Sequence, residues 1–182
     1  MNAVTTTVAK EARDKYVTPV GKGKDVVTVM IYMCGTDLES KYGMATSDLS
    51  EIAKASISDK VNIIVETGGC KKWQNSVVSN SVNEIYQVAS GGLKRLESNF
   101  GKDAMTDPDN LTSFIKYCNK NFPADRNFLI MWDHGGCSIS GYGYDEKQSG
   151  NDTMNLSEIS SALKKANCKF AWLGFAACLM AT

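Results

Sequence analysis

One histidine and one cysteine stand at comparable places in this sequence, each after an apolar run typical of a buried strand. His134, the only histidine in the 182 residues, follows the apolar run 128–132. Cys178 lies at the carboxyl end of a second apolar run, which starts at Phe170. A thiol attacks a carbonyl carbon as the thiolate, and a nearby imidazole can generate that thiolate. The pair therefore predicts a cysteine peptidase with His134 as base and Cys178 as nucleophile.

The residues around this pair add to the prediction. Gly135 and Gly136 follow the histidine and allow a sharp turn that brings the backbone close to a ligand. A tetrahedral oxyanion needs hydrogen-bond donors, and the backbone N–H groups of Gly135 and Cys178 are candidates. Each residue also has a plainer interpretation, because a lone histidine is often structural and a cysteine among apolar residues often belongs to the core. Their coincidence at matching strand ends favours the active site.

The surrounding elements alternate in a way that would bring the pair together. We expect buried strands at 26–33, 61–66, 128–132 and from residue 170 onward. We expect helices after Thr36, which forms a capping-box pattern with Glu39, after Asp107 and after Asn155. A break in the first helix is expected near Gly43. Such alternation predicts an α/β fold with a mostly parallel sheet, right-handed crossovers and helices on both faces. Sites form at the carboxyl edge of such sheets.

Three stretches fall outside this alternation. Residues 1–25 are polar and predict an N-terminal arm, with one domain over 26–182. Val77–Val78 and residues 82–88 suggest a β-hairpin that projects from the main sheet. The stretch 137–154 is rich in Gly, Ser and Asp, and it is longer than a passive connection needs. We therefore expect it to be a functional or mobile loop.

Composition excludes several classes of function. Lys plus Arg equal Asp plus Glu at 20 each, so net charge gives no case for nucleic acid or an anionic membrane. No apolar run approaches the roughly 20 residues of a membrane span. Six cysteines are too few for a disulfide scaffold, and with one histidine and no C-x-x-C spacing we expect no metal site. Gly91–Gly92 forms no phosphate loop, which argues against a nucleotide-binding protein.

Three segments carry a resemblance to a known family. They are Val-Met-Ile-Tyr-Met-Cys-Gly-Thr-Asp-Leu-Glu (29–39), Leu-Ile-Met-Trp-Asp-His-Gly-Gly (129–136) and Leu-Gly-Phe-Ala-Ala-Cys-Leu-Met-Ala (173–181). From about residue 26 to the end the chain resembles the clostripain family of cysteine peptidases, in the caspase, gingipain and legumain clan. The resemblance implies a caspase-like three-layer sandwich with His134 and Cys178 as the catalytic dyad. It also implies cleavage after Arg or Lys, autoprocessing in the 137–154 loop with Lys147 as candidate site, and a secreted or cell-envelope protein. The chemistry requires no cofactor, while some members depend on calcium.

The chain departs from the family pattern in two ways. The family usually has Asp two residues before the nucleophile, where this chain has Ala176. A carboxylate there would pair with the Arg or Lys head group of a substrate, and a methyl group cannot. Asp37 could face the same substrate pocket or could simply begin a helix. Family members also continue beyond the cysteine strand, so we expect a C-terminal chain of the same protein as a partner. The alternative is a non-catalytic caspase-like binding module.

Overall fold

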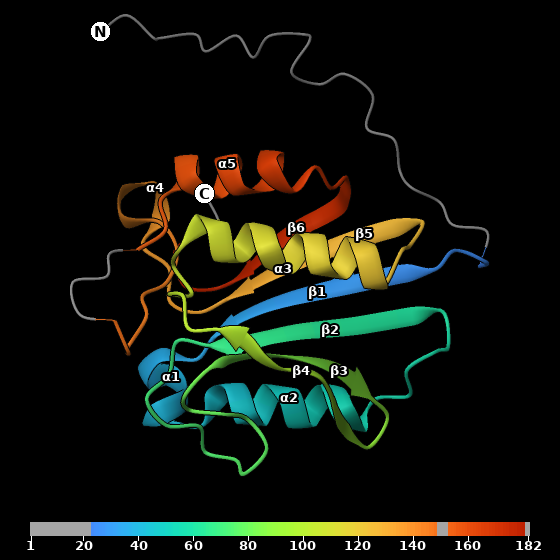
Figure 1. Cartoon of the computed structure of the whole chain (residues 1–182), viewed down its shortest axis with the longest axis horizontal. Helices are drawn as coiled ribbons and strands as arrows, with labels where there is room; N and C mark the ends of the chain where they lie inside the picture. Colours follow the sequence, from blue (N-terminus) through green and yellow to red (C-terminus); the bar gives the residue numbers. More distant parts are fainter. Residues whose placement is uncertain (1–22, 149–152, 181–182) are drawn as a thin grey trace, which may run out of the picture.

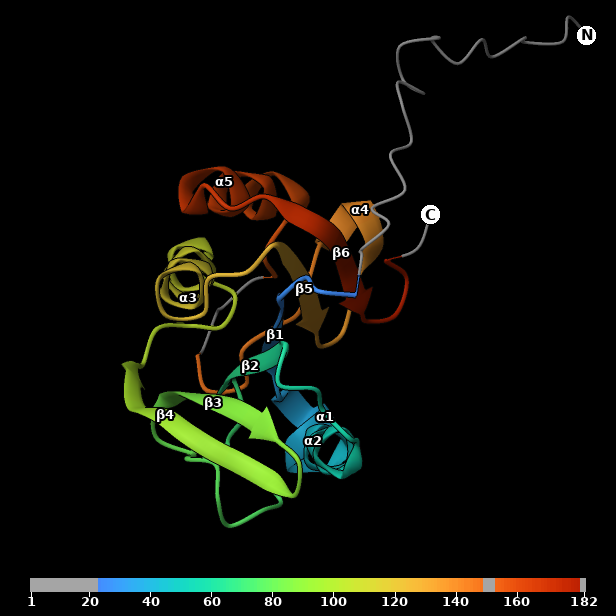
Figure 2. The ribbon, with the colours of Figure 1, turned by 90° about the vertical axis from the view of Figure 1, so that its right-hand side faces the viewer.

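The computed structural model describes residues 23–148 and 153–180 and shows one six-stranded sheet between two layers of helices (Figures 1 and 2). The strand order is β4-β3-β2-β1-β5-β6. The strands are β1 (Val27–Cys34), β2 (Val61–Gly68), β3 (Asn83–Ala89), β4 (Gly92–Gly101), β5 (Arg126–Trp132) and β6 (Phe170–Ala176). The helices are α1 (Thr36–Ser40), α2 (Met44–Lys54), α3 (Pro108–Asn121), α4 (Cys137–Ser140) and α5 (Leu156–Ala166).

The four strands β2, β1, β5 and β6 run parallel, and all four were expected from their apolar runs. Side chains alternate along β1, so that Met30 and Tyr32 enter the core beneath α3 and α5. Ile31 and Met33 point the other way, into the core beneath α2. Burial on both faces explains why these strands appear as continuous apolar runs. The predicted α/β sandwich with helices on both faces is confirmed.

The β-hairpin has a different position from the expected one. β3 pairs with β2 in antiparallel fashion, with Tyr86 opposite Val65, so the hairpin continues the sheet instead of projecting from it. The second strand of the hairpin is β4, not residues 77–78. The carbonyl of Val77 instead accepts hydrogen bonds from the Tyr86 hydroxyl (3.0 Å) and the Arg95 guanidinium (2.5 Å). β4 was not predicted from the sequence, because it is an exposed edge strand with few apolar residues.

The predicted helices are present, but one cap was assigned wrongly. Thr36 is the first residue of α1, and Gly35 occupies the cap position. The Thr36 hydroxyl donates to the Asp133 carboxylate (3.1 Å) and accepts from the Leu38 N–H (3.4 Å). Glu39 is buried and accepts from the backbone N–H of Thr46, at the start of α2, over 2.8 Å. The break near Gly43 is confirmed, since Gly43 separates α1 from α2.

The other two helix starts follow the sequence. Asp107 caps α3 by accepting from the Asp109 N–H over 2.8 Å. Asn155 and Glu158 form a capping box at α5. These two helices pack together on one face of the sheet (Figure 1).

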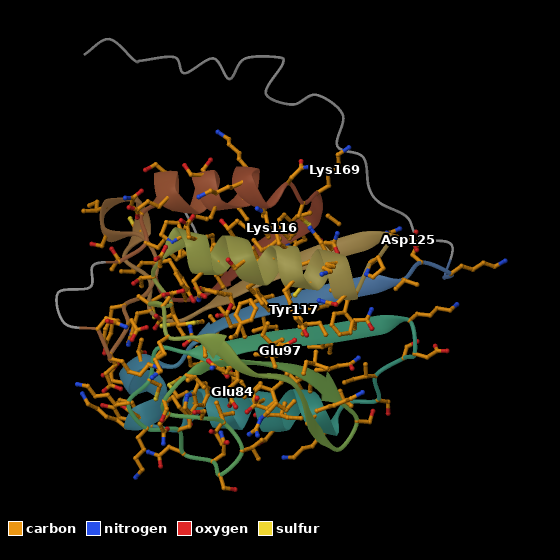
Figure 3. All side chains as sticks on the ribbon, in the orientation of Figure 1. Glu84, Glu97, Lys116, Tyr117, Asp125 and Lys169 are labelled. Atoms are coloured by element: carbon orange, nitrogen blue, oxygen red, sulfur yellow. The ribbon has the colours of Figure 1, made fainter. Side chains whose placement is uncertain are left out.

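The predicted catalytic residues lie at one of the two rims of the sheet. Asp125 and Lys169, labelled in Figure 3, precede β5 and β6 and mark the amino-terminal rim. His134 and Cys178 follow the same strands at the opposite rim.

Within the described ranges no helix has the length and apolar character needed to cross a membrane. Residues 1–22 of the predicted arm lie outside the described part of the chain.

Candidate active site

The strands that lead to the predicted catalytic residues lie side by side and end at one rim (Figure 1). β5 and β6 pair in parallel with Trp132 opposite Ala176. Just beyond this pair, the Asp133 N–H donates to the Ala176 carbonyl over 3.3 Å. His134 and Cys178 each lie two residues past the last pair, so the expected adjacency of their strands is confirmed. Their catalytic roles stay predictions.

Gly135 lies directly against the segment that carries Cys178. A side chain at Gly135 would overlap the carbonyl oxygen of Cys178 and the side chain of Met180. Only glycine lets two backbones approach this closely. Cys178 is exposed, and the His134 side chain retains 40 % of its exposure. The His134 and Cys178 side chains are therefore both accessible, and the residue after His134 packs against the backbone of Cys178.

The imidazole of His134 is held by two side chains from distant parts of the sequence. Its Nε2 lies 2.8 Å from Oδ1 of Asp37, and its ring stacks on Tyr144 at 5.7 Å between centroids and 17° between planes. The Tyr144 hydroxyl donates to the same Oδ1 over 2.8 Å. The hydrogen bond from His134, helped by that from Tyr144, lowers the pKa of Asp37 to about 2. Asp37, which the sequence left as either a pocket residue or a helix-start residue, contacts the imidazole and lies in the first turn of α1.

Asp133 forms the buried floor of the site and was missed as a functional residue. Its carboxylate accepts from the backbone N–H groups of His134 (2.6 Å) and Tyr144 (3.0 Å) and from the Thr36 hydroxyl (3.1 Å). Burial raises its pKa to about 7, although these donors and Cys34 oppose the shift. Thr36 has a positive φ of 46°, an unusual conformation for a β-branched residue. Asp133 thus ties the ends of β1 and β5 to the loop that carries Tyr144.

Ala176 lines an open hollow of about 250 Å³ on the α2 side of the sheet. The hollow has mainly apolar walls and two acidic side chains, Asp48 and Glu51, both from α2. Asp48 accepts a 2.7 Å hydrogen bond from the indole N–H of Trp132. The remaining lining residues are Ile31, Met33, Ile52, Ile130 and Trp132. An apolar slot with carboxylates at one wall suits a long side chain with a cationic head.

The described parts of the stretch 137–154 contain more regular structure than a free loop would. It contains the short helix α4, and the buried Tyr142 forms β-bridges with Gly135 and Met154. Lys147 lies in a turn, is partly buried, and donates its backbone N–H to the Asp145 carboxylate over 2.8 Å. Residues 149–152 lie outside the described part of the chain.

Four of the other cysteines have surroundings that oppose thiolate formation. Burial raises the pKa of Cys34 and Cys118 well above the ordinary value, and that of Cys70 to about 12. Burial also raises the pKa of Cys168. Cys178 is the exposed cysteine. In residues 23–148 and 153–180, no group of three or more His, Cys, Asp or Glu side chains could hold a metal ion, and calcium dependence stays a prediction.

Comparison with known proteins gives the family. Residues 31–182 match the model of the clostripain family, peptidase family C11. The chain belongs to the clostripain family. Clostripain from Hathewaya histolytica is 26 % identical over an alignment 232 residues long, which covers 100 % of this chain and 43 % of that protein.

Two solved structures of clostripain-family proteins show the same fold. A secreted C11 cysteine protease from Bacteroides thetaiotaomicron, in complex with an irreversible peptide inhibitor, has a TM-score of 0.67 and 20 % identity, covering 85 % of this chain and 43 % of that one. An inactive zymogen C11 protease from Parabacteroides distasonis has a TM-score of 0.56 and 20 % identity, covering 84 % and 42 %. The fold is thus the caspase-like sandwich that was predicted. The chain spans less than half the length of these relatives.

Proposed function

We propose that this chain carries the catalytic dyad of a clostripain-type cysteine endopeptidase, with His134 as base and Cys178 as nucleophile. The observation that supports this most is the pairing of β5 with β6, which ends both strands at one rim two residues before these side chains. The exposure of Cys178, in contrast to buried thiols such as Cys34, also supports it. Family membership makes peptide bonds the expected substrates.

The proposed reaction uses only groups at this rim. The imidazole of His134 takes the proton of the Cys178 thiol, and the thiolate attacks the peptide carbonyl carbon. The backbone N–H groups of Gly135 and Cys178 donate to the oxyanion. The intermediate then collapses, the peptide C–N bond breaks, and the amine leaves with the proton from His134. Water, giving a proton to His134, hydrolyses the thioester and frees Cys178.

We place the side chain that precedes the cleaved bond in the hollow beside Ala176. A lysine or arginine stem would lie along its apolar walls, and its head would reach the carboxylates of Asp48 and Glu51. These two residues offer negative charge from α2, although Ala176 offers none. Cleavage after Arg or Lys is therefore part of the proposal even without the usual Asp.

Three further features belong to the same proposal. The chain is cut by its own activity after Lys147, in a turn that leads into the 149–152 stretch. It works outside the cell or in the cell envelope, as the B. thetaiotaomicron relative is described as secreted. A C-terminal part of the same protein pairs with the outer edge of β6, the last strand of the described sheet.

Hydrolysis of fluorogenic peptides tests the function. Peptides with Arg, Lys or Asp before the reporter group are incubated with the chain and with its Cys178→Ala and His134→Ala variants. The proposal expects cleavage of the Arg and Lys peptides only, abolished by either substitution, and a new fragment ending at Lys147 by mass spectrometry. Cleavage that survives Cys178→Ala, or a preference for Asp, contradicts it.

A second candidate is a non-catalytic binding module, and Ala176 is the observation that favours it. Ala176→Asp separates the two. A peptidase should gain about tenfold or more in kcat/KM for basic peptides, because a charge-assisted hydrogen bond forms in a partly enclosed hollow. If the chain is a binding module, its Ala176→Asp variant should cleave none of the peptides but should still bind a basic peptide in a calorimetric titration.

A further inference from the structure

The His134 imidazole is fixed more firmly than a two-residue dyad requires. Asp37 comes from α1, directly after β1, and its Oδ1 lies 2.8 Å from Nε2 of His134. Tyr144 covers a face of the ring and donates its hydroxyl to the same oxygen over 2.8 Å. On the other oxygen of Asp37, the Lys41 ammonium lies 3.3 Å away. The Asp37 carboxylate therefore has partners on both of its oxygens, and one of these partners is His134.

The chemistry of these partners decides which ring nitrogen holds the proton. An ionised carboxylate only accepts hydrogen bonds, so the nitrogen that faces it must be the donor. The low pKa of Asp37, about 2, keeps it ionised at neutral pH. In the neutral imidazole Nε2 therefore carries the hydrogen and Nδ1 holds the free lone pair. Only the nitrogen with the lone pair can take a proton from a thiol.

Tyr144 is in turn held by its own backbone. Its N–H donates to Asp133 over 3.0 Å, and its carbonyl accepts from the Cys34 thiol over 3.2 Å. The hydroxyl therefore reaches Asp37 from a fixed point. We propose that Asp37, oriented by Tyr144, is a positioning residue that keeps His134 in the Nε2–H form, so that Nδ1 is the nitrogen that takes the proton of Cys178. The last step rests on the proposed peptidase function; the positioning itself does not.

The arrangement has a consequence for processing. The residues after Tyr144 are anchored as well: Asp145 accepts from the Met105 N–H over 2.9 Å, and Glu146 accepts from the Ser40 hydroxyl over 2.9 Å. All these anchors precede Lys147. A cut after Lys147 would therefore leave Tyr144 on Asp37, and the base would keep its orientation in the cut protein.

The single histidine makes a direct test possible. In the ¹⁵N-labelled chain, prepared without a histidine tag, the imidazole nitrogens of His134 give the only such signals, and their shifts report which nitrogen holds the proton. At a pH where the ring is neutral, the fraction with the proton on Nε2 should exceed that of the same chain unfolded in urea, which serves as internal reference. Asp37→Asn should speed exchange of this proton with water by about tenfold, because a charge-assisted hydrogen bond is lost. Tyr144→Phe should speed it less.

Matched controls are Asp59→Asn and Tyr42→Phe, at exposed positions that should leave the imidazole signals unchanged. An Nε2–H fraction equal to or below that of the unfolded chain overturns the proposal, and this reading needs no variant. Exchange in Asp37→Asn as slow as in the original chain, with a native amide spectrum, overturns it too. These signals do not depend on hydrolysis, so an inactive chain with the Nε2–H form would refute the peptidase function and leave the positioning intact.

Discussion

Replacing Gly135 with alanine should displace the segment that carries Cys178. The new Cβ would overlap the carbonyl oxygen of Cys178 and meet the Met180 side chain. A backbone oxygen cannot rotate away as a flexible side chain can, so the segment after β6 must shift. Overpacking of this kind costs about 1–3 kcal/mol. Alanine recovers about 0.4–1 kcal/mol by restricting the unfolded chain, so we expect a net destabilisation of about 1–2 kcal/mol.

Gly92→Ala is the matched control, because nothing lies within 4 Å of a Cβ built at Gly92. It should be neutral or slightly stabilising, by about 0.5 kcal/mol. Urea unfolding gives the free energy for each variant, and the rate at which iodoacetamide alkylates Cys178 reports the position of the nucleophile. Gly135→Ala should lower the free energy of unfolding and change the alkylation rate of Cys178, whereas Gly92→Ala should do neither. If both variants match the original chain in stability and alkylation rate, Gly135 is not packed against Cys178 as described.

Two further predictions concern stability. Burial raises the pKa of Glu66 to about 8, so the folded state keeps this proton while the unfolded state loses it above about pH 4.5. Stability should therefore fall between about pH 4.5 and 8, by an amount on the order of 5 kcal/mol for this group. In urea titrations, Glu66→Gln should remove this part of the dependence of the unfolding free energy on pH and leave the part due to Asp133. An unchanged dependence on pH refutes this prediction. Asn155→Ala should destabilise the protein by about 1 kcal/mol, because the α5 capping box is lost. Urea unfolding measures this loss against the neutral control Ser160→Ala. A loss of stability no larger than that of the control refutes the prediction.

The sequence was sufficient for the main strands and for the rim that they share. Runs such as 128–132 are buried on both faces, and such burial leaves a continuous apolar pattern that is visible without coordinates. Once β5 and β6 were expected to be parallel neighbours, His134 and Cys178 had to follow them at one edge. The caps of α3 and α5 were equally accessible, because a cap depends only on residues a few positions away.

The errors arose where distant residues override a local pattern. Thr36 and Glu39 have the spacing of a capping box, but Asp133 binds the first and the start of α2 binds the second. The role of Asp37 could not be found from its helix-start position, since its partner lies 97 residues away. Asp133 stands next to His134 and could have been noticed as a buried acid within the motif. Tyr144 had no pattern to indicate it.

Covalent labelling by a peptide electrophile tests the central claim most directly. The chain carrying Ala176→Asp is treated with a peptidyl chloromethyl ketone that ends in arginine, and the modified cysteine is identified by peptide mass mapping. Because the other thiols are buried or lack the base, Cys178 should react at least about tenfold faster than Cys137 or Cys168, and His134→Ala should abolish this preference. Labelling that falls on Cys137 or Cys34 instead of Cys178, or a rate at Cys178 that does not change in His134→Ala, would contradict a peptidase built on these two strand ends.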